Sequence, residues 1–159
     1  MKNKKVLFFG RYDETKSKLL FEVLKKKFRF VKAVWSKNQN QRFPKKILEY
    51  KGDYIFCYRS YYILSDKLLK QYKYAINFHP GSPAYRGIGC LNFAVLNGEK
   101  KYGVTAHIIN KKVDNGKIIL TKNFSIKKME SLSSILRKTN IFNFHLAKKI
   151  IGLIYDDEN

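Results

Sequence analysis

Short apolar runs alternate with amphipathic segments through the first half of the chain. The apolar runs predict buried strands at Lys5–Phe9, Phe30–Trp35, Tyr54–Tyr58 and Ala75–Phe78. The segments between them predict helices at Thr15–Lys27, Pro44–Tyr50 and Ser65–Gln71. The apolar positions that share one face of the first helix at helical spacing are Leu19, Leu20, Val23 and Leu24. This order predicts an α/β fold, an open, mostly parallel twisted sheet with helices on both faces.

The second half of the chain begins with a constrained loop at residues 79–89, which contains two of the three prolines and three of the nine glycines. A short helix is expected at Cys90–Asn97. Two strands, Val104–Ile109 and Lys117–Phe124, flank the turn Asp114-Asn115-Gly116. Ser131 or Ser133 caps a last helix that passes Leu136, Ile141, Phe144, Ile150 and Leu153 before the acidic tail 156–159. We expect one domain over residues 1–159.

The composition is strongly basic, with 33 Lys plus Arg against 12 Asp plus Glu and a formal net charge of +21. Such a balance raises nucleic-acid binding as a hypothesis. However, 27 of the 33 basic residues are Lys, whereas readout of phosphates and base edges favours Arg. Lys, Asn, Ile, Phe and Tyr, whose codons are rich in A and T, form close to half of the chain. A bias of genome composition therefore explains the charge better than a nucleic-acid surface, which is kept as an alternative.

The same composition bears on where the protein acts. No run of about 18 apolar residues is present, so we expect no membrane-spanning helix. The apolar run after the basic start has four residues, too few for a signal peptide. Cys57 and Cys90 have no metal-type spacing and suggest reduced thiols. We expect a cytoplasmic protein.

The end of the fourth predicted strand is the best candidate for chemistry. Ligands of doubly wound sheets bind beyond the carboxyl ends of the strands. Asn77 and His79, two residues apart, should share one face there, so that an amide and an imidazole converge on one reacting atom. Asp114 is the best candidate for a carboxylate that orients the imidazole. Each residue also has a structural interpretation: Asn77 as a backbone cap, His79 as a satisfied polar group and Asp114 as a turn residue.

The stretch Ala75–Leu120 adds a motif that spans about 45 residues. It contains Asn77-x-His79, a proline loop with Arg86-Gly87, the run Asn97-Gly98-Glu99, Gly103-Val104-Thr105 with His107, and Asp114-Asn115-Gly116. In this order and spacing the motif resembles the core of the folate-dependent formyltransferases. Weaker similarity extends to residues 53–69 and to the opening strand. The resemblance implies a Rossmann-like formyltransferase fold and an enzyme that uses 10-formyltetrahydrofolate as co-substrate.

The resemblance also implies roles for individual residues. Asn77, His79 and Asp114 match the catalytic trio of the family. In the implied reaction an amine attacks the formyl carbon, Asn77 and His79 stabilise the tetrahedral oxyanion, and Asp114 holds the imidazole and helps to move the amine proton. The positions implied to bind the pterin are Tyr61, Tyr62, Ile63, Leu64, Asn110 and Val113. No metal is implied, and the sequence offers no cluster of metal ligands.

The acceptor is expected to be a small primary amine, with the amino group of a nucleotide-linked sugar favoured. The positions expected to bind it are Gly10, Arg11, Ser82 and Arg86. Arg86 has a second interpretation as a clamp of the loop. The loop Pro80-Gly81-Ser82-Pro83 lacks the family's usual Ser-Leu-Leu-Pro, and Gly10-Arg11 lacks the phosphate loop of the glycinamide enzyme.

Other interpretations stay open beside this one. Because the sequence ends near Asn159, we expect no C-terminal domain of the kind that the resemblance assigns to tRNA binding, and a partner subunit in a homodimer is one way to complete an open acceptor pocket. An enzyme of the methionyl-tRNA or glycinamide-ribonucleotide type, a non-catalytic folate-binding homologue, and a basic nucleic-acid module on the same fold are the alternatives.

Overall fold

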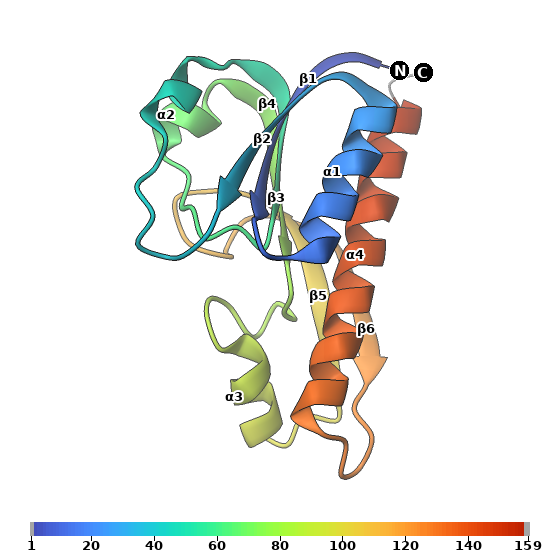
Figure 1. Ribbon diagram of the computed structural model, residues 1–159. Helices are drawn as coiled ribbons and strands as arrows, with labels where there is room; N and C mark the ends of the chain where they lie inside the picture. The colour runs from blue at the N-terminus through green and yellow to red at the C-terminus, as the bar shows by residue number, and fades with distance from the viewer. Residues whose placement is uncertain (1, 158–159) are drawn as a thin grey trace.

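The computed structural model, which describes residues 2–157, contains one six-stranded sheet with the strand order β2-β1-β3-β4-β5-β6 (Figure 1). The strands are β1 (Lys2–Arg11), β2 (Phe28–Ser36), β3 (Gly52–Tyr58), β4 (Tyr72–His79), β5 (Lys101–Ile108) and β6 (Ile118–Ser125). The first four run parallel, whereas β5 is antiparallel to β4 and β6 is antiparallel to β5. The predicted α/β fold with an open, mostly parallel sheet is therefore confirmed.

Helices cover both faces of this sheet, as the alternation of elements predicted. Helices α1 (Thr15–Lys27) and α4 (Leu132–Asp157) stand side by side on one face, while the 3₁₀ helix η1 (Lys45–Glu49) and α2 (Asp66–Leu69) lie on the other (Figure 1). Both of these last two helices are shorter than predicted. Among the described helices, none is long and apolar enough to cross a membrane. Of the expected acidic tail, Glu158 and Asn159 lie outside the described residues.

Two apolar clusters, one on each face of the sheet, hold these layers together. Alternate strand residues such as Phe8, Phe56 and Phe78 pack under α1 and α4, while their neighbours Phe9 and Cys57 pack under α2 and η1. Fully burying an aliphatic or aromatic side chain of this kind contributes about 1.5–3 kcal/mol. A third cluster joins α3 (Cys90–Leu96) to the start of α4.

The buried face of α1 differs from the predicted one. Leu20 and Leu24 are fully buried, as expected, but Leu19 is 49% exposed. The position that the pattern missed is Ser17, which is fully buried because its hydroxyl accepts the Arg11 amide N–H and donates to the Tyr58 carbonyl. A polar residue therefore takes the place of a leucine on the core face, and it ties the helix to the ends of β1 and β3. The cap of α4 is as predicted, because the Ser131 hydroxyl accepts the Ser134 N–H at 3.3 Å.

Candidate active site

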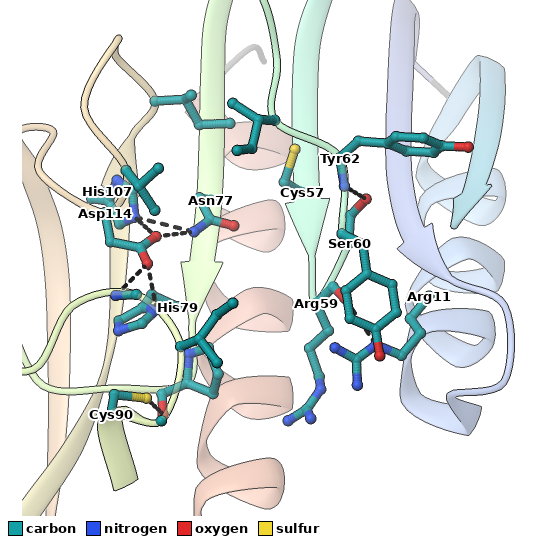
Figure 2. A pocket seen from close by; sticks show the side chains of 18 of the residues that line it. Arg11, Cys57, Arg59, Ser60, Tyr62, Asn77, His79, Cys90, His107 and Asp114 are labelled. Atoms are coloured by element: carbon teal, nitrogen blue, oxygen red, sulfur yellow. Dashed lines mark hydrogen bonds and ion pairs between the residues drawn. The ribbon is translucent and has the colours of Figure 1, made fainter. Parts of the chain in front are cut away.

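The carboxyl end of β4 gathers the three residues that the sequence singled out. Asn77 and His79 lie on the same face of the strand and point toward Asp114 (Figure 2). The Asn77 amide nitrogen donates to Asp114 Oδ1 at 2.9 Å, and His79 Nδ1 lies 3.2 Å from Asp114 Oδ2. The side chains of His79 and Asp114 are only 6% and 11% exposed. An amide, an imidazole and a carboxylate thus form one largely buried cluster.

Asp114 reaches this cluster through the reversal of chain direction between β4 and β5. Because β5 runs antiparallel to β4, it ends at Ile108, opposite Ile76, and the loop that follows it leaves the sheet beside Asn77. Asp114 itself has a φ of 49°, in the left-handed region, and its Oδ2 accepts the Gly87 amide N–H at 3.0 Å. A Cβ at Gly116 would overlap the carbonyl oxygen of Ile108, so only glycine fits this close approach. The backbone therefore fixes where the carboxylate points.

The proline loop after His79 supplies the second partner of the imidazole. His79 Nε2 donates to the Tyr85 carbonyl oxygen at 2.7 Å. A Cβ at Gly81 would overlap that nitrogen, so the glycine of the loop lets the backbone pass beside the ring. The loop is held in place because the Thr105 hydroxyl donates to the Gly81 carbonyl at 2.8 Å. Both ring nitrogens of His79 thus face oxygen acceptors, and the doubly protonated imidazolium satisfies both.

The charges of the cluster reinforce one another. Burial acts to lower the pKa of His79, but the Cys90 thiol and then the Asp114 carboxylate outweigh it. The pKa of His79 therefore lies above its ordinary value of 6.5. Burial acts to raise the pKa of Asp114, but the hydrogen bond with His107 and the charge of His79 hold it below its ordinary value of 3.8. An imidazolium–carboxylate pair follows from these directions.

His107 is a member of the cluster that was not among the predicted site residues. Its Nε2 lies 3.2 Å from the Asn77 amide nitrogen and 3.3 Å from Asp114 Oδ1, while Nδ1 donates to the Ile108 carbonyl at 2.9 Å. When His107 Nε2 carries a proton it donates to Asp114, and when it does not it accepts from the Asn77 amide. His107 is part of the motif quoted above, and β5 places it directly opposite Asn77. That pairing is the signal that would have identified it.

A cavity of about 780 Å³ opens beside the cluster at the carboxyl ends of the parallel strands. Its lining contains Asn77, His79 and Asp114 together with the predicted pterin positions Tyr61, Tyr62, Ile63, Leu64, Asn110 and Val113. Leu64 is buried and Ile63 is largely exposed, so the two leave the loop in different directions. Arg11 and Arg59 line the cavity on the side of β1 and β3 (Figure 2).

Three predicted acceptor positions lie elsewhere among the described residues. Gly10 sits inside β1, where a Cβ would meet the rings of Phe8 and Trp35, and the cavity lining does not include it. Ser82 and Arg86 line a smaller hollow of about 30 Å³ instead, whose lining also includes His79, His107 and Asp114. The Arg86 guanidinium donates to the Asn115 side-chain oxygen and to the Pro83 carbonyl, which is the geometry of a loop clamp.

Within residues 2–157 no group of three or more His, Cys, Asp and Glu side chains has an arrangement that could hold a metal ion. Both cysteines, Cys57 and Cys90, are free and buried.

A Rossmann-like sheet with a buried amide–imidazole–carboxylate cluster beside a large cavity at its strand ends defines the class, an α/β protein with an enzyme-type site. The comparisons with known proteins give the family. The formyl transferase family model matches residues 4–149, and the chain therefore belongs to the formyl transferase family.

Two relatives with similar sequences belong to larger proteins. The chain is 32% identical over 148 residues to the bifunctional polymyxin resistance protein ArnA of Wigglesworthia glossinidia brevipalpis. The matched region covers 89% of this chain and 22% of that protein. It is 36% identical over 81 residues to a methionyl-tRNA formyltransferase of Chlorobium limicola, 50% of this chain and 26% of that protein. The chain thus spans about a quarter or less of the length of these relatives.

Solved structures share the fold at low identity. An N-formyltransferase from Helicobacter canadensis, in complex with folinic acid and dTDP-3-aminofucose, has a TM-score of 0.79 and 21% identity over 96% of this chain and 64% of that one. A phosphoribosylglycinamide formyltransferase from Bacillus halodurans has a TM-score of 0.76 and 18% identity over 93% of this chain and 95% of that one.

Proposed function

We propose that this protein transfers a formyl group from 10-formyltetrahydrofolate to a primary amine, and that the amine belongs to a nucleotide-linked amino sugar. The observation that carries the proposal is the buried cluster of Asn77, His79 and Asp114 at the edge of the 780 Å³ cavity. Membership of the formyl transferase family supports the same reaction.

The cavity fits a folate in size and lining. A volume of about 780 Å³ falls within the roughly 300–1,000 Å³ that small-molecule sites occupy. Segment 61–64 faces it with aromatic and apolar side chains, and Ile109 and Val113 add two apolar ones, which suit the faces of a flat heterocycle. Their backbone N–H and C=O groups can read its polar edge. Bound there, the co-substrate supplies the electrophilic formyl carbon.

His79 acts as the principal source of positive charge. Because Asp114 and the Tyr85 carbonyl each take one ring N–H, the ring is held as an imidazolium beside the place where negative charge develops. A preorganised donor of this kind contributes about 3–4 kcal/mol to transition-state stabilisation. A ligand oxygen would compete with the Tyr85 carbonyl for the hydrogen bond that His79 Nε2–H donates.

Asn77 positions the reactants and donates to the oxyanion. Its amide nitrogen now contacts Asp114 at 2.9 Å and His107 at 3.2 Å. The contact with His107 is the longer one, and it is the one that a substrate oxygen replaces. The amide oxygen of Asn77 points away from Asp114, where it can accept a hydrogen from the incoming amine (Figure 2).

Asp114 receives the proton that the amine loses. Its carboxylate lies against both histidines, so it can take this proton directly or through a bridging water. The proton then passes to the tetrahydrofolate nitrogen as the bond between that nitrogen and the formyl carbon breaks. The low pKa of Asp114 keeps the carboxylate ionised before the reaction.

The choice of acceptor is supported by the similar proteins. The structure from Helicobacter canadensis holds dTDP-3-aminofucose, and its fold covers 96% of this chain. The similarity to methionyl-tRNA formyltransferases makes methionyl-tRNA the second candidate acceptor.

The test is a formylation assay with 10-formyltetrahydrofolate and a panel of amines: dTDP- and UDP-linked amino sugars, glycinamide ribonucleotide and methionyl-tRNA. We expect formylation of a nucleotide-linked amino sugar. Asn77→Ala and His79→Ala should each lower kcat by about 10²–10³. His145→Ala, which removes an exposed histidine of α4, is the matched control and should be unchanged. If no amine is formylated, or if the two site variants turn over at the normal rate, the proposal is wrong.

A further inference from the structure

Two arginines stand together on the side of the cavity opposite the Asp114 cluster. Arg11 ends β1, and Arg59 directly follows β3, the strand that pairs with it. Arg11 Nε donates to the Arg59 carbonyl at 3.2 Å, and the Arg11 guanidinium lies 4.1 Å from the centre of the Tyr61 ring. Both arginines line the cavity (Figure 2).

The positive charge of this pair is not balanced within the described part of the chain. No ion pair within 4.0 Å among residues 2–157 includes either arginine. Burial and then the charge of Arg59 lower the pKa of Arg11, and the acidic neighbours Asp13 and Glu14 oppose this more weakly. Glu14 is already engaged, because its carboxylate accepts the Ser17 N–H at 2.6 Å. Two like charges brought together at a partly buried surface favour an anion between them.

Arg59 is also held in a costly conformation. Its φ of 56° lies in the left-handed region, which a side chain longer than that of Asn rarely adopts. Its Nη1 donates to the Asn140 side-chain oxygen of α4 at 2.5 Å, while its Nε is buried without a hydrogen-bond partner. A strained backbone that holds a guanidinium group at a cavity wall is the mark of a group arranged for a ligand.

The position of the pair suits one end of a substrate whose other end reacts at Asn77. Tyr58 pairs with Phe78, so Arg59 lies beside the place where β4 ends at His79. Arg11 lies one strand further from the cluster. Neighbouring strands are about 4.8 Å apart, so the backbones at Arg59 and Arg11 lie about one and two strand spacings from β4. A sugar ring is of this size.

We propose that Arg11 and Arg59 bind the diphosphate of the amine acceptor. This inference rests on the proposed function and deepens it, because it assigns the acceptor to nucleoside-diphosphate sugars through two named side chains. Guanidinium groups bind phosphate oxygens with paired N–H donors, and a doubly charged anion balances both. The amino group of the sugar then reaches Asn77, and the rest of the cavity remains for the folate.

The experiment measures binding by titration calorimetry with three probes: UDP, inorganic pyrophosphate and folinic acid. In Arg11→Gln and Arg59→Gln the affinity for UDP and pyrophosphate should fall by about 10- to 100-fold. Affinity for folinic acid should stay within about twofold, because no charge-assisted hydrogen bond to it is removed. Arg29→Gln, an exposed arginine of β2, removes the same charge elsewhere and should leave all three affinities unchanged.

Three results would overturn the inference. Pyrophosphate could bind both variants as tightly as the parent protein. Folinic acid could lose affinity while pyrophosphate does not, which would mean that the pair binds the glutamate carboxylates of the folate. Arg29→Gln could weaken pyrophosphate binding equally, which would reduce the effect to net charge.

Arg59→Lys guards against a folding artefact. It keeps the positive charge but loses the paired N–H donors, so pyrophosphate binding should fall less than in Arg59→Gln, and the variant should melt near the parent temperature. The assay of formyl transfer is independent of these titrations. If no amine is formylated while pyrophosphate binding still depends on Arg11 and Arg59, the proposed reaction fails and the anion site stands.

Discussion

The two sides of the cavity differ in how their charges are balanced. On the β4 and β5 side, Asp114 lies between two histidines and accepts a backbone N–H, so its charge and hydrogen bonds are satisfied within the protein. On the β1 and β3 side, Arg11 and Arg59 lie together, and none of the described residues forms an ion pair with either of them. The first side is complete before a substrate arrives, and the second is completed by one.

This difference indicates a division of labour. Groups that stabilise a transition state work best when their surroundings hold them in place beforehand. Groups that select a substrate gain most when their charge is neutralised only by that substrate. We therefore expect changes on the Asp114 side to alter kcat and changes on the arginine side to alter KM for the acceptor.

The largest expected effect follows from Asp114→Asn. The substitution keeps the shape of the side chain but removes the charge that holds His79 as an imidazolium, so kcat should fall by about 10²–10⁴. The affinity for pyrophosphate should stay within about twofold. Steady-state assays of formyl transfer measure kcat, and calorimetry on the same preparation measures the affinity for pyrophosphate. A loss of pyrophosphate binding in this variant would show that the two sides are not separate.

Gly116→Ala tests whether the backbone positions the carboxylate. The added Cβ would overlap the Ile108 carbonyl, and relief of that overlap should cost about 3 kcal/mol of unfolding free energy and displace Asp114. Gly152→Ala is the matched control, because nothing lies near a Cβ there and alanine favours the interior of α4, so stability should rise by about 0.5–1 kcal/mol. Urea unfolding measures both changes. Equal effects of the two substitutions would contradict the close approach at Gly116.

The pH dependence of the pair gives a smaller effect. The folded-state pKa of His79 is raised, so its contribution to stability is full below 6.5 and is lost as the pH rises through that raised pKa. The stability difference between the parent and Asp114→Asn should therefore shrink as the pH rises above this range. NMR titration of the imidazole should also show a lower His79 pKa in the variant. A His79 pKa that is the same in both proteins would exclude the ion pair.

Arg86→Ala is expected to have the smallest effect. Arg86 binds Asn115 and the Pro83 carbonyl, away from the large cavity. Loss of such exposed hydrogen bonds should lower kcat by about threefold to tenfold through the loop, with KM for the acceptor unchanged. Steady-state kinetics distinguish the two constants. A large rise in the KM for the acceptor would instead support the sequence-based expectation that Arg86 binds the acceptor.

Most of the fold could be predicted because periodicity reports burial directly. The strands are short apolar runs, and each predicted strand lies within or overlaps an observed one. The error at Leu19 arose because Ser17, a polar residue, is buried through hydrogen bonds that depend on the ends of β1 and β3. Periodicity alone cannot identify such a position, since its partners are distant in the chain.

The site could be predicted only in part for the same reason. Asn77 and His79 follow from their place at a strand end, and Asp114 was a candidate carboxylate from its turn, whereas the family motif joined the three as a catalytic trio. His107 contributes because β5 runs antiparallel to β4 with Asn77 opposite it, and that register is a property of the assembled sheet. Arg59 has its role through a left-handed backbone that no pattern of residue types indicates.

The strand order places β2 and β6 at the two edges of the sheet, where part of the positive charge of the chain lies. Open edges expose unpaired N–H and C=O groups that can join the sheets of two molecules, and lysine on an edge strand opposes that. β6 carries Lys122 and is flanked by Lys117, while β2 carries Arg29 and Lys32. Edge charges of this kind keep copies of a basic protein from aggregating through their sheets.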